Sequence, residues 1–228
     1  MRAPTLWLRL TLRLLPFAAL LLSVAAIAQT LAPLGPLDDG RVTYFIAAPP
    51  ADVEINPGDA ELVLWAVESW QRAAAGTLTF VRAADEQQAL VRVYWAPAAG
   101  GQYGEMRPLR VDGRRGGAVY IRPDTAALGE EIAQRARMDA LFRDTIVYLT
   151  CLHELGHALG LSHTADFEDV MYFFGFGGDI PEFFDRYRRT LRERPDIRRS
   201  SGLSTGDLER LDALYGPRAA PGELTVAN

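Results

Sequence analysis

Residues 153–163 read HELGHALGLSH and contain every histidine of the chain. If this stretch is helical, His153 and His157 lie about 6 Å apart along the axis, with both imidazoles on one face. Gly160 has no Cβ, so the chain can turn sharply there and bring His163 toward the same point. Three protein ligands with a fourth position open to water are typical of a catalytic zinc, whereas structural sites are closed by four ligands.

Glu154 lies about 100° round the helix from His153, so its carboxylate can hold water beside the metal without being a ligand. The alternative is that the histidines are ordinary core residues, as happens when a bare HExxH pattern arises by chance. The glycine and the third histidine at their fixed spacing favour metal binding. A carboxylate at this position favours chemistry over a purely structural site.

The flanking sequence predicts an α+β domain. Strand-like alternation occurs at residues 41–48, 77–82, 89–95, 106–111 and 118–122. Helical periodicity occurs at 60–74, 138–159, 181–194 and 203–216. Asp59 is the predicted cap of the first helix, Ser204 the cap of the last, and Gly160 the end of the long helix at 138–159.

The N-terminal segment predicts a secretory signal, residues 1–28. Three arginines precede an apolar run at 14–28, and small residues end it, which predicts cleavage after Ala28. An uncleaved anchor is the alternative, but the run is shorter than the roughly 20 residues of a spanning helix, and Pro16 interrupts it. We expect a secreted or periplasmic protein without stable membrane insertion.

Composition and charge limit the partners. Removing residues 1–28 changes 24 basic and 29 acidic residues to 21 and 29, a formal net charge of −8, which argues against nucleic acid as a partner. A lone cysteine, Cys151, excludes an intramolecular disulfide and is expected to be a small core residue. The chain has no lysine, and its usage of Ala, Arg and Gly suggests a bacterial source.

HELGHALGLSH followed by Met171 resembles the metzincin zinc peptidases, in which a methionine turn follows HExxHxxGxxH. The chain is most similar to the matrixins in three further features: the DVMY stretch at 169–172, the pattern of the helix at 203–216, and the order of strands and helices. The resemblance implies a twisted mixed sheet of about five strands, a long active-site helix and a C-terminal helix. We expect a linker at 29–40, a catalytic domain at 41–216 and a flexible tail at 217–228.

The resemblance also implies the roles of individual residues. His153, His157 and His163 are then the ligands of one zinc ion, Glu154 the general base and acid, and Met171 the floor of the site. The implied function is a secreted, monomeric zinc endopeptidase that cleaves protein or peptide substrates by Glu-assisted attack of a zinc-bound water. A calcium ion is compatible with the chain, although no recognisable calcium loop is present.

The expected substrate lies extended along an edge strand near 106–111. A specificity pocket is predicted from Leu149, Met171, Tyr172 and Phe173. Phe173 stands where matrixins have proline, and the stretch 173–202 is longer than its counterpart, either as a lid or enlarged pocket or as a helix packed on the body.

For four residues near the motif the sequence allows two alternative roles each. Asp166 and Asp169 either orient a histidine or cap the loop, and Tyr148 and Tyr172 are either oxyanion donors or packing residues. Two other functions also stay open: a zinc-stabilised binding module without turnover, and a metallohydrolase acting on a non-peptide or a single dedicated substrate.

Overall fold

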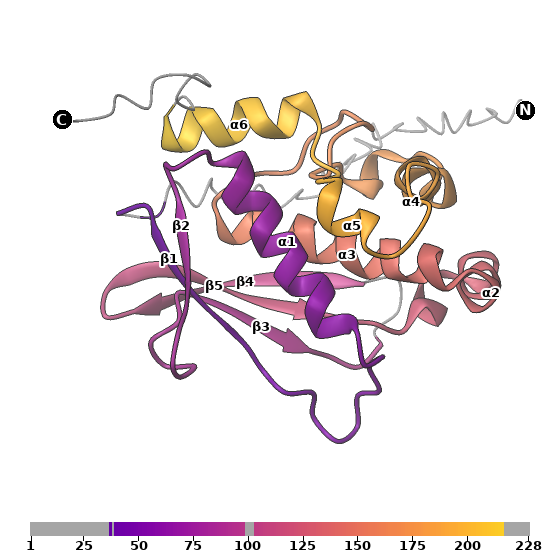
Figure 1. The fold of residues 1–228 in the computed structure, drawn as a ribbon, viewed down its shortest axis with the longest axis horizontal. Coiled ribbons are helices and arrows are strands. Elements are labelled where there is room, and N and C mark those ends of the chain that lie inside the picture. The colour runs from indigo at the N-terminus through magenta and orange to yellow at the C-terminus, as the bar shows by residue number, and fades with distance from the viewer. Residues whose placement is uncertain (1–36, 38, 99–102, 217–228) are drawn as a thin grey trace, which may run out of the picture.

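The computed structural model describes residues 37, 39–98 and 103–216. Its strands form one sheet, in the order β2-β1-β3-β5-β4. The strands are β1 (Arg41–Ile46), β2 (Thr79–Arg82), β3 (Val91–Trp95), β4 (Gly104–Val111) and β5 (Arg114–Ile121). The long helices α1 (Asp59–Ala73) and α3 (Ala140–Ala158) cover one face of this sheet, and the core lies between them and the sheet (Figure 1). The α+β class expected from the sequence is therefore confirmed.

The sheet is mixed. Strands β1, β2, β3 and β5 are parallel, whereas β4 runs antiparallel to β5 and forms an edge. Asp112 and Gly113 join β4 to β5 with φ values of +50° and +79°, as a two-residue hairpin turn of type I′ requires. The sequence prediction missed this hairpin and began β5 at residue 118. The strand passes through Gly116, where a Cβ would lie 2.1 Å from the Leu90 carbonyl oxygen.

Helix α1 packs on α3 through its apolar face. Trp70 is fully buried, and its indole Nε1 donates to the Leu152 carbonyl at 2.9 Å. The prediction that Asp59 caps α1 is wrong, because Gly58 occupies the cap position and Asp59 is the first helical residue. The Asp59 carboxylate instead accepts a hydrogen bond from the Asn56 amide at 2.9 Å.

The helix predicted at 138–159 is α3, and a separate helix that was not predicted, α2 (Glu130–Met138), precedes it. Asp139 separates them in an extended conformation, and its carboxylate caps α3 by accepting from the Phe142 amide at 3.0 Å. Helix α2 has no clear signal in the sequence because its apolar face is narrow, with three buried residues. Gly160, at φ +101°, follows the end of α3, as predicted. The Leu161 amide donates to the Gly156 carbonyl, which completes a Schellman turn.

The helix predicted at 181–194 is shorter in the structure, where α4 (Ile180–Arg188) ends before residue 189, and the short α5 (Asp196–Arg199) follows beyond the predicted span. Arg188 Nη1 donates to the Leu191 carbonyl at 3.0 Å just beyond α4, where the chain turns. Helix α6 (Thr205–Tyr215) is capped by Ser204, as predicted, and Ser204 forms a reciprocal capping box with Asp207. Two short 3-10 helices are η1 (Thr125–Leu128) and η2 (Phe174–Phe176).

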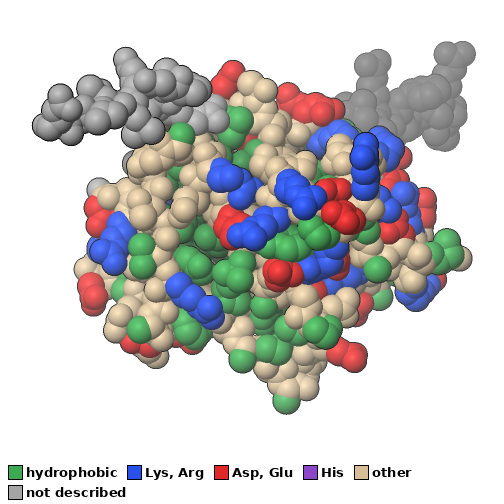
Figure 2. Space-filling model, viewed as in Figure 1, with side chains coloured by type: hydrophobic (Ala, Val, Ile, Leu, Met, Phe, Trp, Pro, Cys, Tyr) green, Lys and Arg blue, Asp and Glu red, His purple; other side chains and the backbone are tan. Residues whose placement is uncertain are grey.

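Helices α4 and α5 pack on the body of the domain. Phe184 and Ile197 are completely buried, and Arg198 pairs with Glu68 of α1 at 2.7 Å. Figure 2 shows basic and acidic side chains intermixed on the face that includes α1 and α5. Of the two interpretations of the long 173–202 stretch, the structure favours a helix packed on the body.

The predicted signal at 1–28, most of the linker and the tail at 217–228 lie outside the described residues. Among the residues that are described, no helix combines the length and apolar character needed to cross a bilayer.

Candidate metal centre

The three histidines meet at one point. His153 and His157 lie one turn apart on α3, and His163 approaches them from the loop after Gly160. The Nε2 atom of His163 lies 3.3 Å from that of His153 and 3.1 Å from that of His157. Two nitrogens held tetrahedrally at about 2.0–2.1 Å from zinc are about 3.3 Å apart, so the separation fits a zinc ion.

The other ring nitrogens fix which atoms face this point. His153 Nδ1 donates to the Val170 carbonyl at 2.7 Å, and His157 Nδ1 donates to the Leu161 carbonyl at 2.8 Å. A carbonyl oxygen can only accept, so the proton sits on Nδ1 and the Nε2 lone pair points inward. The donor set is therefore suited to a metal ion.

The environment keeps these imidazoles neutral. Burial lowers the pKa of His153 well below its usual value, and neighbouring His157 lowers it further. Burial also lowers the pKa of His157, and burial followed by the charge of His157 lowers that of His163 to about 4. Neutral imidazole is the form that binds metal, so no proton has to be displaced near pH 7.

Glu154 is a buried carboxyl beside this cluster. Glu154 is 6% exposed. Burial raises the pKa of its carboxyl to about 8; the positive charge of Arg122 opposes this rise, and the negative charge of Glu105 adds to it. A Cβ on Gly104 would lie 2.5 Å from Glu154 Oε1, so only glycine at the start of β4 leaves room for this side chain. No described residue donates a hydrogen bond to the Glu154 carboxyl.

Met171 lies directly beneath the helix turn that carries the histidines. Its side chain is fully buried, and a Cβ on Gly156 would come within 2.5 Å of its Sδ and 3.0 Å of the Trp70 ring. Gly156 thus lets the thioether approach the α3 backbone between His153 and His157. The local reason for glycine in HELGH is this close approach.

Backbone pairing fixes His163. The amide of the next residue, Thr164, donates to the Met171 carbonyl at 2.9 Å, and the Phe173 amide donates to the Thr164 carbonyl at 3.1 Å. Asp207 of α6 holds the same turn by accepting from the Val170 amide at 2.8 Å and the Met171 amide at 3.4 Å. The C-terminal helix therefore positions the carbonyl that orients His153.

Sequence reasoning did not identify Gly104, Gly156 or Asp207 as parts of this site. Asp207 was visible only as the third helical residue in a capping box. Its contact with Val170, 37 residues earlier, is tertiary and leaves no local signal.

The open supporting roles are resolved by contacts elsewhere. Asp169 accepts hydrogen bonds from the hydroxyls of Thr164 and Ser204. Asp166 accepts a hydrogen bond from the Glu168 amide. The groups that orient His153 and His157 are backbone carbonyls instead. Tyr148 is buried in the core and bonds to Ser69 and to the Ser201 carbonyl, which makes it a packing residue. Cys151 is likewise fully buried, as expected.

The predicted pocket residues occupy different surroundings. Leu149 lines a cavity of about 340 Å³ together with Val170, Phe183, Tyr187, Gly202 and Leu203. Tyr172 is buried, and its hydroxyl donates to the Gly177 carbonyl at 3.0 Å. Phe173 is partly exposed and stacks on His163. Tyr172 and Phe173 do not line the cavity that contains Leu149.

Comparison with known proteins agrees with this geometry. Residues 38–176 match the family model of the matrixins. Interstitial collagenase of Sus scrofa is 33% identical over 81 residues, which is 35% of this chain, and that of Oryctolagus cuniculus is 31% identical over 83 residues, which is 36%. Each match spans 13% of the collagenase's own length. The chain belongs to the matrixin family, and its fold is that of a metzincin-type zinc metallopeptidase domain.

Proposed function

We propose that this protein is a zinc-dependent endopeptidase, with His153, His157 and His163 as metal ligands and Glu154 as general base and acid. One observation carries the proposal: a buried carboxyl, to which no described residue donates a hydrogen bond, lies beside three neutral imidazoles whose Nε2 atoms converge. Membership in the matrixin family supports it. The catalytic domain is placed at residues 41–216, with Met171 as the floor of the site.

Glu154 moves the proton in this proposal. A zinc ion held by the histidines supplies Lewis acidity, which polarises the scissile carbonyl and acidifies water. Glu154 takes a proton at a carboxylate oxygen as the water oxygen bonds to the carbonyl carbon, and it delivers that proton to the leaving nitrogen as the C–N bond breaks. Burial favours this role, because a pKa near neutrality suits a group that must both accept and donate a proton.

Strand β4 is the proposed binding edge for substrate. It pairs with β5 on one side, and no described strand pairs with its other side. An extended peptide can add to such an edge through backbone hydrogen bonds. Gly104 places the start of β4 against Glu154, so a peptide on this strand passes the carboxyl.

Secretion belongs to the proposal as well. The apolar segment at 14–28 supports export with cleavage after Ala28, and the mature protein is proposed to act as a monomer outside the cytoplasm. The competing function is a zinc-stabilised binding module without turnover. Glu154 favours catalysis, since a binding module gains nothing from a buried carboxyl beside its metal ligands.

The decisive experiment compares the purified wild-type protein with Glu154→Gln, using an unstructured protein as substrate and measuring zinc content. We expect about one zinc in each, cleavage by the wild type and at least a hundredfold loss in the variant, a loss in the range of general acid–base catalysis. Glu131→Gln, an exposed glutamate on α2, is the control and should cleave normally. Zinc in both proteins without cleavage by either would favour the binding module or a dedicated substrate.

A further inference from the structure

The hairpin formed by β4 and β5 is basic in a protein that is otherwise acidic. Residues 104–122 contain five arginines and two acidic residues, whereas the rest of residues 29–228 contains 16 arginines and 27 acidic residues. The hairpin includes the edge strand that is proposed to bind substrate. A local positive potential of this kind attracts and orients anionic groups.

Arg110 differs from the other arginines of this hairpin whose contacts are resolved. Three of those arginines are already paired with carboxylates, as Arg107–Glu105 at 2.7 Å, Arg122–Glu105 at 3.3 Å and Arg114–Asp39 at 2.5 Å. Within the described residues, the hydrogen bond of Arg110 is to a neutral acceptor, the Gly113 carbonyl, at 2.9 Å. Arg110 is exposed, so the other donors of its guanidinium are accessible to a ligand.

The pairing register places a second arginine directly opposite Arg110. Arg110 of β4 pairs with Arg115 of β5 across the hairpin. Directly opposite side chains in antiparallel strands lie on the same face, with Cβ atoms about 4.5–5.5 Å apart, and like charges at such positions repel each other. An anion bound beside both guanidinium groups reduces this repulsion. Arg115 therefore strengthens the attraction of Arg110 for an anion.

The arginine pair lies on the face of the sheet that carries the metal centre. Gly104 and Arg110 are an even number of residues apart on β4, so their side-chain directions coincide, and a Cβ on Gly104 would point at Glu154. A Cβ on Gly117 would lie 2.9 Å from the last residue of α3, and Arg115 precedes Gly117 by two residues on the same face. The pair thus lies just beyond the end of α3. At about 3.4 Å per residue, Arg110 is roughly 20 Å along β4 from Gly104.

We propose that Arg110, together with Arg115, binds a carboxylate side chain of the polypeptide that lies along β4, about six residues from the residue beside Glu154. The occupant is an acidic segment of the substrate, because the pair lies on the same binding edge as the metal centre and its charge is complementary to a carboxylate. This inference rests on the proposed endopeptidase function. It adds that cut sites are selected by an aspartate or glutamate distant from the cut bond.

The turn of the hairpin offers a matched variant with the opposite effect. Asp112, at φ +50°, is the first turn residue, and its negative charge opposes the binding of an anion at Arg110. Asparagine is equally suited to a type I′ turn, so Asp112→Asn removes the charge and keeps the turn. We expect Asp112→Asn to strengthen the binding of acidic peptides and Arg110→Gln to weaken it.

The first test measures binding in the absence of turnover. Zinc-loaded Glu154→Gln protein is titrated with two labelled peptides of serine and alanine, one with glutamate at every fourth position and one with glutamine there. Adding Arg110→Gln should weaken the glutamate peptide by about fivefold at low salt, as loss of one charge contact implies, and leave the glutamine peptide unchanged. Arg137→Gln, on the exposed side of α2, is the control and should change neither affinity.

Two results of this titration would overturn the inference. One is an equal loss in Arg110→Gln and Arg137→Gln, which would assign the effect to overall charge. The other is displacement of the labelled glutamate peptide by polygalacturonate at lower concentrations than by the unlabelled peptide, which would identify an acidic polysaccharide as the occupant.

The second test uses the active enzyme. Wild-type, Arg110→Gln and Arg137→Gln proteins digest one unstructured protein, and mass spectrometry locates the cut sites. We expect aspartate and glutamate to be enriched about five to seven residues to one side of the cut bond, and Arg110→Gln alone to lose this enrichment at an unchanged melting temperature. An identical distribution in Arg110→Gln contradicts the inference. Absence of cleavage by the zinc-loaded wild type contradicts the proposed function itself, and the titration then decides whether Arg110 binds acidic peptides.

Discussion

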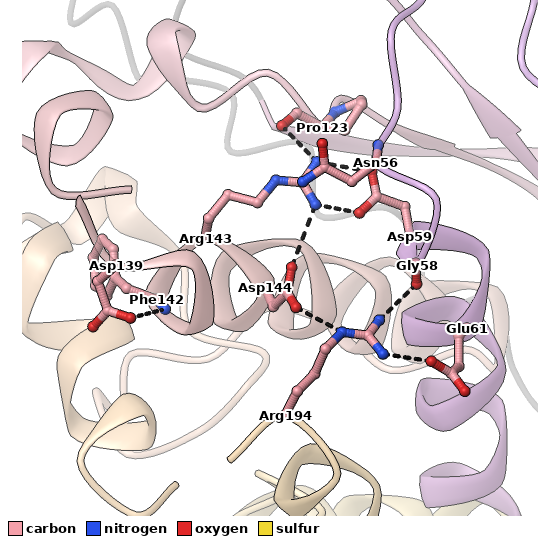
Figure 3. Close-up of polar contacts among 10 residues, drawn as sticks. All are labelled: Asn56, Gly58, Asp59, Glu61, Pro123, Asp139, Phe142, Arg143, Asp144 and Arg194. Carbon is pink, nitrogen blue, oxygen red and sulfur yellow. Dashed lines mark hydrogen bonds and ion pairs between the residues drawn. The ribbon is translucent and has the colours of Figure 1, made fainter. Parts of the chain in front are cut away.

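The two ends of helix α3 are held in opposite ways. At the N-terminal end, arginine and aspartate side chains from three parts of the chain form a charged network (Figure 3). At the C-terminal end, neutral imidazoles, backbone carbonyls and the Met171 thioether surround the helix. One helix thus carries a charged anchor at Arg143 and Asp144 and an uncharged histidine cluster at His153 and His157.

The charged end depends on contacts distant in sequence. Arg143 makes a bidentate pair with Asp59, the first residue of α1, and also approaches Asp144. Arg194, from the turn after α4, donates to Asp144 at 2.7 Å and to the Gly58 carbonyl at 2.7 Å. The network joins α1, α3 and the α4–α5 segment, as Figure 3 shows for its members from each.

The uncharged surroundings at the C-terminal end of α3 have a chemical reason. A fixed positive charge near the histidines would oppose metal binding, and an additional carboxylate would compete as a ligand. Backbone groups position His153 and His163, and the Asp207 carboxylate acts on this turn through the amides of Val170 and Met171. Charge fixes the helix where it cannot disturb the site.

The largest effect is expected from Arg143→Met, which leaves Asp59 buried without its partner. The free energy of unfolding should fall by about 3–5 kcal/mol, as for a broken buried ion pair. Urea unfolding measures it, and zinc affinity of the folded protein should stay unchanged. Arg137→Met, which breaks the exposed pair with Glu130, is the control and should change stability by less than about 0.5 kcal/mol. Equal losses in both would remove the contrast between the buried anchor and the surface.

Glu154→Gln tests how the buried carboxyl at the C-terminal end of α3 makes stability depend on pH. In the metal-free folded protein the Glu154 pKa is about 8, above the usual 4.5, so the folded state keeps a proton that the unfolded state releases. Wild-type stability should therefore fall, relative to the variant, by about 1.4 kcal/mol per pH unit between those values, or roughly 3 kcal/mol from pH 5.5 to 7.5. Thermal unfolding in chelator measures this difference. A constant difference across the range would show that the carboxyl is not held protonated.

Asp207→Asn tests whether α6 positions the turn at Val170 and Met171, which lies beside the histidines. The amide loses the charge and one acceptor oxygen for the Val170 and Met171 amides, so unfolding should become easier by about 2 kcal/mol. Zinc affinity should weaken as well, because the Val170 carbonyl orients His153. Chelator competition measures the affinity. Glu209→Gln, exposed on the same helix, is the control, and an unchanged affinity in Asp207→Asn would limit its role to stability.

The smallest effect is expected from Arg198→Met, which removes an exposed pair between α5 and Glu68 of α1. Its contribution should be the smallest of those considered and should disappear in about 1 M salt, where the screening length is about 3 Å. Urea unfolding at two salt concentrations measures this. A large loss that persists in high salt would mean that α5 is anchored through this pair rather than through buried Ile197.

Much of the site could be predicted from the sequence because its three histidines lie within eleven consecutive residues. His153 and His157 are fixed by helical periodicity, and Gly160 turns the chain at the predicted residue. The hairpin between β4 and β5 was accessible too, since Asp112-Gly113 is a strong two-residue turn signal, yet the many surrounding glycines hid the strand pattern. Helix α2 was missed because only one narrow side of it is buried.

By itself, the sequence determined the convergence of the three histidines, the α+β class and the capped C-terminal helix, because each depends on spacing along a few consecutive turns. Only the tertiary structure decided that Asp207 holds the turn at Val170 and that Gly104 makes room for Glu154. The same holds for Arg143 meeting Asp59, 84 residues away. Such contacts form when distant elements pack together, and burial then gives a carboxyl or an ion pair an energy that its local sequence does not contain.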